Sequence, residues 1–95
     1  MPNTLFFGDV LRFERNIQGL TFRDLERRAG IPYQLISTYE QKKKMPSLFN
    51  AIQIAYALGC SIAYLVGDDT MTESERKKFE VIREQKILEG MEEWM

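Results

Sequence analysis

The side chains best suited to bind another molecule lie in residues 33–44 of this 95-residue chain. Four polar residues stand at helical spacing, so they would share one face of a helix. They are Tyr33, Gln34, Ser37 and Thr38. Their hydroxyl and amide groups suit the edges of nucleic-acid bases. The run Lys42–Lys44 follows and could bind phosphate, although three lysines in a loop are also typical of a solvated turn.

The composition argues against an enzyme. The chain has no histidine and one cysteine, so His-based nucleophile pairs, imidazole acid–base catalysis, thiolate metal cages and internal disulfides are all excluded. We expect no metal and no cofactor. Cys60 follows Gly59 in an apolar run, which predicts a buried, unreactive thiol. Neither a signal peptide nor a membrane-length apolar run is evident, so we expect a cytoplasmic protein in a reducing compartment.

The positive charge is localised, although the net charge is only −1. Residues 71–95 carry more acidic than basic side chains, whereas residues 1–70 carry a slight basic excess. In residues 67–70, the glycine and the two aspartates are typical of the end of one helix, and Thr70 could begin another. We therefore expect a domain at residues 6–69 and a helical extension at residues 70–95.

Apolar residues recur at spacings of three and four, which predicts an all-α fold. The expected helices lie near 6–18, 21–28, 32–40, 47–58, 61–66 and 72–93. Thr21, Ser47, Ser61 and Thr72 are suitable N-caps, and Asp24 would complete a capping box with Thr21. The aromatic residues recur on apolar faces and are assigned to the core. They are Phe6, Phe7, Phe13, Phe49, Tyr56 and Tyr64.

Residues 20–41 have the spacing of a helix-turn-helix: a short amphipathic helix, a turn containing Gly30, and a second short helix. Leu25, Ala29, Ile31, Ile36 and Tyr39 are the expected buried positions, which leaves the polar face of the second helix outward. Further short motifs occur in a fixed order along the chain. They are Leu11–Arg15, Gly19-Leu20-Thr21, Gly30-Ile31, Ile36-Ser37, Tyr39-Glu40, Pro46-Ser47-Leu48, Ile54-Ala55, Ala57-Leu58-Gly59 and Tyr64–Gly67.

In the order and spacing of these motifs, the chain resembles the Cro/C1-type (xenobiotic-response-element) helix-turn-helix regulators of the phage-repressor kind. The resemblance implies a five-helix domain whose third helix enters the DNA major groove, and a symmetric homodimer that covers two half-sites. It places base contacts on Tyr33, Gln34, Ser37 and Thr38, with Gln34 suited to adenine. It places phosphate contacts on Thr21, Arg23, Gln41, Lys42, Lys43 and Lys44, and a structural salt bridge between Arg15 and Glu40.

Three residues depart from the family pattern. Phe22 replaces a polar glutamine that would reach phosphate, so its ring is expected to pack on Tyr33 or Pro32, or the protein docks at a different angle. Lys42 replaces the glycine that ends the third helix, so the turn is either strained or differently built. Pro32 removes a side-chain cap but fits the first turn of a helix.

The extension carries an apolar face at helical spacing that needs a partner. It consists of Val81, Ile87, Leu88, Met91 and Trp94, continued by Met95. We expect this face to dimerise or to bind another protein, rather than to pack on its own domain.

Two functional hypotheses follow. The first is a sequence-specific transcriptional regulator, a small repressor that binds a palindromic double-stranded DNA operator as a dimer; a restriction–modification controller is a variant of it. The second is a protein–protein regulator, such as an antitoxin or a repressor antagonist, that acts through the C-terminal helix.

Overall fold

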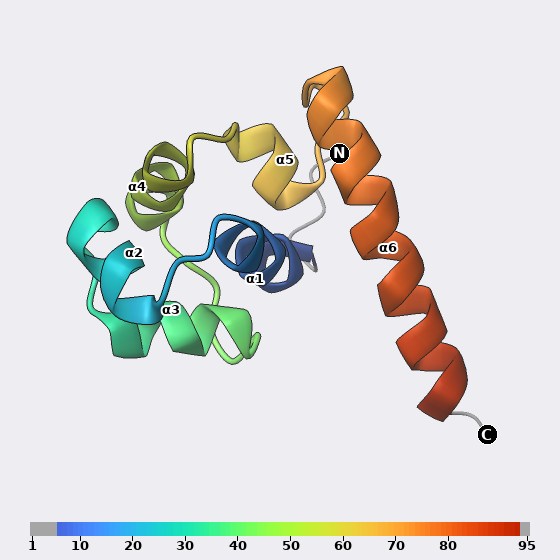
Figure 1. Ribbon diagram of the computed structural model, residues 1–95, viewed down its shortest axis with the longest axis horizontal. Helices are drawn as coiled ribbons and strands as arrows, with labels where there is room; N and C mark the ends of the chain where they lie inside the picture. The colour runs from blue at the N-terminus through green and yellow to red at the C-terminus, as the bar shows by residue number, and fades with distance from the viewer. Residues whose placement is uncertain (1–5, 94–95) are drawn as a thin grey trace.

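The computed structural model describes residues 6–93, with side chains up to residue 85, and all of its regular structure is helical (Figure 1). The all-α prediction is therefore confirmed, and the helices begin and end close to the expected residues. They are α1 (Phe7–Ile17), α2 (Phe22–Ala29), α3 (Tyr33–Glu40), α4 (Leu48–Leu58), α5 (Ile62–Val66) and α6 (Glu73–Glu93). No helix in the described part of the chain is both long and apolar enough to cross a membrane.

Helices α2, α4, α5 and α6 are capped at their N-termini by the hydroxyl side chains expected from the sequence, Thr21, Ser47, Ser61 and Thr72. At α2, the Thr21 hydroxyl accepts a hydrogen bond from the Asp24 amide while the Asp24 carboxylate accepts one from the Thr21 amide, which forms a capping box. Ser47 and Ser61 accept equivalent backbone hydrogen bonds at α4 and α5. Each such cap contributes about 1 kcal/mol, so local sequence defines where these helices start.

Helix α1 lies at the centre of the molecule, between α3 on one side and α5 and α6 on the other (Figure 1). Helix α2 packs on both α3 and α4. The largest fully buried side chains come from all five of the first helices. They are Phe7, Val10, Leu11, Leu25, Ile36, Ile54, Tyr64 and Leu65. One core therefore holds the two helices of the helix-turn-helix against the rest of the chain.

The assignment of two aromatic residues of α4 to the core was wrong. Phe49 is 67% exposed and Tyr56 is 87% exposed. Helix α4 has apolar residues nearly all round, so spacing alone could not select its buried face. The buried face consists of Ala51, Ile54, Ala55 and Leu58. The other aromatic residues assigned to the core, among them Phe7 and Tyr64, are buried or packed against it.

The first half of α6 belongs to the same core. Phe79 and Ile82 of α6 are buried, as is Met71 just before the helix, and the Phe79 ring packs edge-on against Phe6 with 5.2 Å between ring centroids. The second half of α6 extends away from the other helices (Figure 1). The division of the chain at residue 70 stays a prediction, and α6 shares a core with the helices that precede it.

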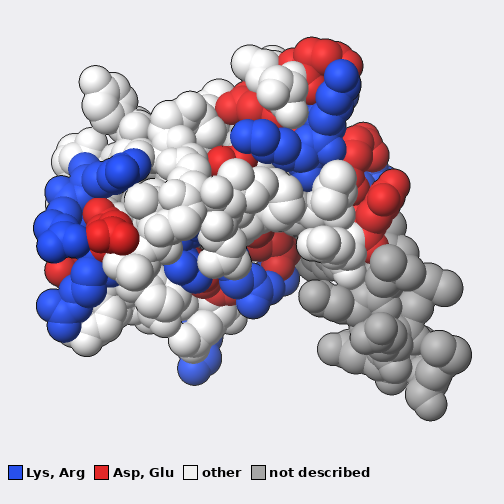
Figure 2. All heavy atoms as spheres, viewed as in Figure 1, with Lys and Arg blue, Asp and Glu red and all other residues white. Residues whose placement is uncertain are grey.

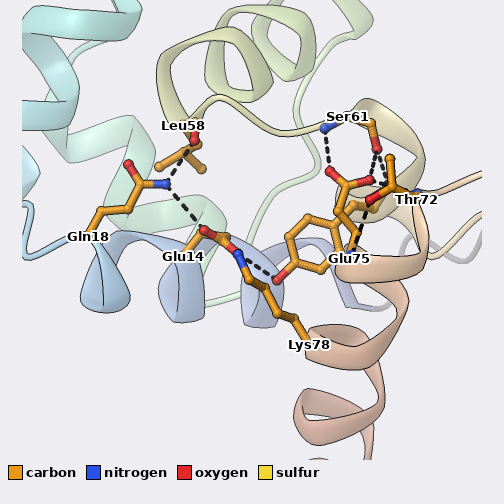
Figure 3. A network of polar contacts seen from close by, with 8 residues as sticks. Glu14, Gln18, Leu58, Ser61, Thr72, Glu75 and Lys78 are labelled. Carbon is orange, nitrogen blue, oxygen red and sulfur yellow. Dashed lines mark hydrogen bonds and ion pairs between the residues drawn. The ribbon is translucent and has the colours of Figure 1, made fainter.

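A buried carboxylate on α1 anchors α6 to the domain (Figure 3). Glu14 is 3% exposed and accepts hydrogen bonds from the Tyr64 hydroxyl at 2.9 Å and from the Lys78 ammonium at 3.1 Å, both at Oε1. The Gln18 amide donates to its other oxygen and also to the Leu58 carbonyl. A buried charge requires such partners, so these contacts stabilise the position of α6 against α1 and α5.

A second carboxylate, Glu75, joins the starts of α5 and α6 (Figure 3). It accepts hydrogen bonds from the Ser61 amide and hydroxyl and from the Thr72 amide. Burial alone would raise the pKa of Glu75, but these hydrogen bonds outweigh it and lower the pKa. Cys60 lies beside this group and is half-buried, not fully buried as expected. Its partial burial and the charges of Glu14 and Glu75 raise the pKa of its thiol to about 12, so the thiol stays protonated.

Candidate nucleic-acid interface

Helices α2 and α3 form the helix-turn-helix. Gly30 ends α2 with φ +70°, a left-handed conformation that glycine adopts without steric cost. Leu25, Ala29 and Ile31 are buried on the α2 side of the turn, and Ile36 is buried on the α3 side. This packing turns the opposite side of α3 toward solvent.

The four candidate base-contact residues lie on that outward side. Gln34 is exposed, and Tyr33, Ser37 and Thr38 are half-buried. The Thr38 hydroxyl donates to the Gln34 carbonyl at 2.9 Å, and Ser37 Oγ accepts from the Gln41 amide at 3.0 Å. Ser37 therefore keeps its hydroxyl proton for an outside acceptor, while Thr38 presents lone pairs and a methyl group. Gln34 can offer both an acceptor and donors, the pair that adenine requires.

Arg23 and Tyr33 form a stacked pair at the start of α3. The Arg23 guanidinium lies 4.4 Å from the centroid of the Tyr33 ring, which is a cation–π contact. Both residues were named from the sequence as DNA contacts, one to phosphate and one to a base. Because the contact restricts both side chains, it positions a cation beside the first turn of α3.

The start of α3 is capped by a residue that sequence reasoning missed. Pro32 occupies the N-cap position and offers no side-chain acceptor. Glu26, on α2, supplies one instead: its Oε2 accepts a hydrogen bond from the Tyr33 amide at 2.8 Å. A carboxylate at this position also interacts favourably with the positive end of the helix dipole. The absence of a cap at Pro32 was the one available signal that another residue must supply it.

Arg15 and Glu40 hold the end of α3 against α1. Arg15 Nε donates to Glu40 Oε2 at 2.7 Å and Nη2 donates to Oε1 at 3.2 Å, a two-pronged pair whose side chains are 14% and 6% exposed. Arg15 also donates to the Leu20 carbonyl. The Phe22 ring lies beneath the same guanidinium, with its centroid 4.2 Å from the Arg15 Cζ atom. Phe22 thereby supports the group that positions α3.

Gly8 allows α1 to approach the end of α3. A Cβ atom at this position would lie 2.5 Å from the Tyr39 carbonyl oxygen and 3.2 Å from that of Glu40. These are backbone atoms, so no side chain could move to make room. Sequence reasoning missed Gly8 because its φ is not unusual and only the tertiary contact shows the need for glycine.

The lysine run divides into two kinds of residue. Lys42 adopts φ +61° at the end of α3, and the Lys43 amide bonds to the Thr38 carbonyl as in a glycine-terminated helix. The turn is therefore the strained alternative, with lysine in the left-handed position at a cost of about 1 kcal/mol. The Lys42 ammonium lies 2.8 Å from the buried Asp9 carboxylate. Lys43 and Lys44 are exposed.

The remaining phosphate candidates lie at the start of α2 and the end of α3. Thr21 and Gln41 are exposed. The Thr21 amide is bonded to Asp24, so its hydroxyl proton is the group left for an outside acceptor. Hydrogen bonds from Thr21 and Arg27 lower the pKa of Asp24 to about 2, so this carboxylate is charged at neutral pH. Figure 2 shows basic side chains gathered around α2, with acidic ones among them.

The expected apolar face of α6 lies mostly outside the described residues. Val81 is 44% exposed, so this face points away from the domain where it begins. The side chains of Ile87, Leu88 and Met91, and Trp94 as a whole, lie outside the described part of the chain. Among the described residues, no group of three or more carboxylate or thiol side chains could hold a metal ion.

Comparisons with known proteins agree with this geometry. A helix-turn-helix family model matches residues 11–65, which span α1 to α5, so the chain belongs to the Cro/C1-type helix-turn-helix family. The family is one of DNA-binding transcriptional regulators rather than enzymes. An immunity repressor protein of Bacillus phage phi105 is 27% identical over 86 residues. The aligned region is 90% of this chain and 60% of the relative, so the chain spans less than two thirds of that protein's length. No solved structure matches the chain significantly.

Proposed function

We propose that this protein is a repressor that binds an operator in double-stranded DNA with α3 in the major groove, and thereby blocks transcription. The observation that carries the proposal is the outward side of α3, where Gln34 is exposed beside three hydroxyl-bearing side chains. The Arg15–Glu40 pair and the Glu26 cap hold this helix at both ends. The similarity to a phage immunity repressor favours repression over activation.

The roles divide between base recognition and backbone contact. We assign base contacts to Tyr33, Gln34, Ser37 and Thr38, because their free hydrogen-bonding groups face outward. We assign phosphate contacts to Arg23, Lys43 and Lys44, with Thr21 and Gln41 beside them. Lys42 serves mainly to hold α3 to α1, because its ammonium already neutralises Asp9.

The family resemblance further implies a homodimer on a palindrome whose half-sites lie about one helical turn, or 34–36 Å, apart. Such a dimer places two copies of α3 in successive major grooves. Because operator symmetry mirrors protein symmetry, a palindrome is the expected selected sequence.

The test is selection from a random duplex pool, followed by binding measurements at several salt concentrations. We expect an enriched palindrome. Gln34→Ala should relax the preference at one base pair, with a loss of about 1–3 kcal/mol there. Lys43→Ala should weaken all sequences alike and reduce the salt slope by about one.

Lys77→Ala is the matched control, because Lys77 is an exposed lysine on α6, away from α3. It should leave both the selected sequence and the salt slope unchanged. If Gln34→Ala and Lys43→Ala reduce specificity equally, the division of roles is wrong. If no duplex is enriched, the repressor proposal fails.

A second candidate function is regulation through a protein partner on α6, as in an antitoxin or a repressor antagonist. The exposure of Val81, at the start of the apolar face, favours it. A chain that enriches no DNA but binds one partner protein stoichiometrically, with Val81→Glu abolishing the complex, would establish this function in place of repression.

A further inference from the structure

Helix α4 carries an apolar face that nothing in the described structure covers. Leu48 is 71% exposed, Phe49 67%, Ile52 42% and Tyr56 87%. These residues stand at spacings of three, four and seven, so they line one side of the helix. The opposite side is buried against the core. We call the four residues the α4 face.

Four large side chains at these exposures amount to roughly several hundred Å², the size of the largest apolar patch on a typical monomer, and such a patch is often functional. The sequence from Met45 to Gly67 contains no charged residue. Uncharged atoms cover the part of the surface where α4 lies, bounded by the basic side chains of α2 (Figures 1 and 2). The α4 face is therefore apolar, and it carries no charge that would favour a charged partner.

We propose that the α4 face is the two-fold contact between two copies of this chain, an inference that rests on the dimeric repressor proposed above. Two observations favour a second copy as the occupant. The four residues of the face carry no charge, so a second copy of the face meets no like-charge repulsion. Their spacing along the helix also allows the face to pack against itself.

The spacing argument follows from the position of Ile52. Leu48 precedes it by four residues and Tyr56 follows it by four. If two α4 helices pack antiparallel about an axis near Ile52, Tyr56 of each copy therefore faces Leu48 and Phe49 of the other. The contact is isologous: residue i meets residue j, and j meets i. Leu48 and Tyr56 are about 12 Å apart along the helix, which is long enough for two turns to interdigitate.

The position of the α4 face is compatible with DNA binding. Helix α4 begins just after the lysine run that follows α3, so a contact across α4 would place the two lysine runs at its rim. Because α3 lies away from α4 in Figure 1, we expect such a contact to leave Gln34 uncovered. Dimerisation and DNA binding would therefore use different sides of the same domain.

The experiment is to measure the dimer dissociation constant of the full chain by sedimentation equilibrium and of four single variants. Phe49→Glu and Tyr56→Glu place a charge on the α4 face at exposed positions, so they should fold normally by circular dichroism. Val81→Glu tests α6, and Gln85→Glu is the matched charge control at an exposed position off the α4 face. We expect the two α4 variants to weaken dimerisation at least about 100-fold and the other two to change it less than about 3-fold.

Disulfide capture gives a positive test. In a Cys60→Ser background, Ile52→Cys should form a disulfide-linked dimer on mild oxidation because it lies near the two-fold axis. Val81→Cys in the same background should not. A Val81→Cys crosslink with no Ile52→Cys crosslink would place the dimer contact on α6 and overturn the inference.

The outcomes separate this inference from the proposed function. A wild-type chain that binds DNA but remains monomeric, or that dimerises equally well with Tyr56→Glu, overturns the α4 contact alone. A chain that dimerises through α4 but enriches no DNA sequence overturns the repressor proposal alone. The inference is supported if Tyr56→Glu is monomeric, retains half-site affinity and loses the added affinity for the palindrome.

Discussion

Helices α3 and α4 follow one another in the chain, and their exposed sides have opposite chemistry. Helix α3 presents hydroxyl and amide groups, whereas α4 presents Leu48, Phe49, Ile52 and Tyr56. They also differ in what holds them. The ends of α3 are held by side chains from α1 and α2, whereas α4 begins with its own Ser47 cap. A hydrated, reversible contact with bases suits the first surface, and a dehydrated contact between proteins suits the second. The comparison shows that α3 depends on its neighbours for its position.

The strongest test of that dependence is Arg15→Ala. The substitution leaves the Glu40 carboxylate buried without its main partner, so we expect a loss of about 3–5 kcal/mol in the free energy of unfolding. Urea unfolding followed by circular dichroism measures it. Ser47→Ala, which removes the cap of α4, should cost only about 1 kcal/mol. A loss below about 1 kcal/mol for Arg15→Ala would mean that water replaces the guanidinium, and that α3 does not need this support.

The next effect in size is expected at Gly8. Gly8→Ala places a Cβ atom 2.5 Å from the Tyr39 carbonyl oxygen, so α1 and α3 must separate at a cost of about 1–3 kcal/mol. Gly19→Ala is the matched control: it meets open space, and only its φ of +67° costs about 1 kcal/mol. Operator affinity should fall for Gly8→Ala only. Equal operator affinity for the two variants would show that α3 is insensitive to its distance from α1.

Local signals in the sequence predicted the fold well. These signals are the helical spacing, the hydroxyl caps and the glycine at the end of α2. Each acts over a few residues, so it can be recognised without knowledge of the tertiary structure. The burial of Phe49 and Tyr56 was wrongly predicted because α4 is apolar on both sides. The choice between its sides depends on how it packs against α2 and α5, which the spacing within one helix does not specify.

The site was predictable to a more limited extent. The outward position of the polar residues of α3 could be predicted because they share one face of a helix, and their role as base contacts stays a prediction. Glu26 and Gly8 were missed, since each acts on a partner that lies in another helix. The Lys42–Asp9 ion pair was missed for the same reason. The outward polar residues of one helix are thus easier to find in a sequence than the residues of other helices that position them.

A smaller effect is expected at the start of α3, where a cap from Glu26 of α2 can be compared with a cap from residue 32 itself. Glu26→Ala removes the cap of α3 and should cost about 1 kcal/mol. Pro32→Ser supplies a hydroxyl at the N-cap. The loss of the proline ring also raises the conformational entropy of the unfolded chain, which lowers the free energy of unfolding by about 0.4–1 kcal/mol. We expect Pro32→Ser to be unfavourable in the wild-type chain and neutral or favourable in the Glu26→Ala background. Additive effects in this double-mutant cycle would show that Glu26 does not act as the cap.

The smallest expected effect is a loss of stability of the α2 cap at acid pH. The cap of α2 includes a carboxylate, whereas the cap of α4 is a hydroxyl. The hydrogen bond from the Thr21 amide, together with that from Arg27, lowers the pKa of Asp24 from 3.8 to about 2. Because the folded-state pKa is the lower one, the stability that Asp24 supplies is fully present above pH 3.8 and is lost as the pH falls through about 2.

Amide resonances recorded during an acid titration would show this difference between the helices. The Thr21 amide should shift with a midpoint near pH 2, the pKa of its Asp24 partner. The Asn50 amide, bonded to the Ser47 hydroxyl, should not shift over the same range, because a hydroxyl does not titrate there. Asp24→Asn should abolish the Thr21 titration and leave Asn50 unchanged. A Thr21 midpoint at the ordinary Asp value of 3.8 would mean that the capping box does not form in solution, and that α2 begins without the carboxylate that distinguishes it from α4.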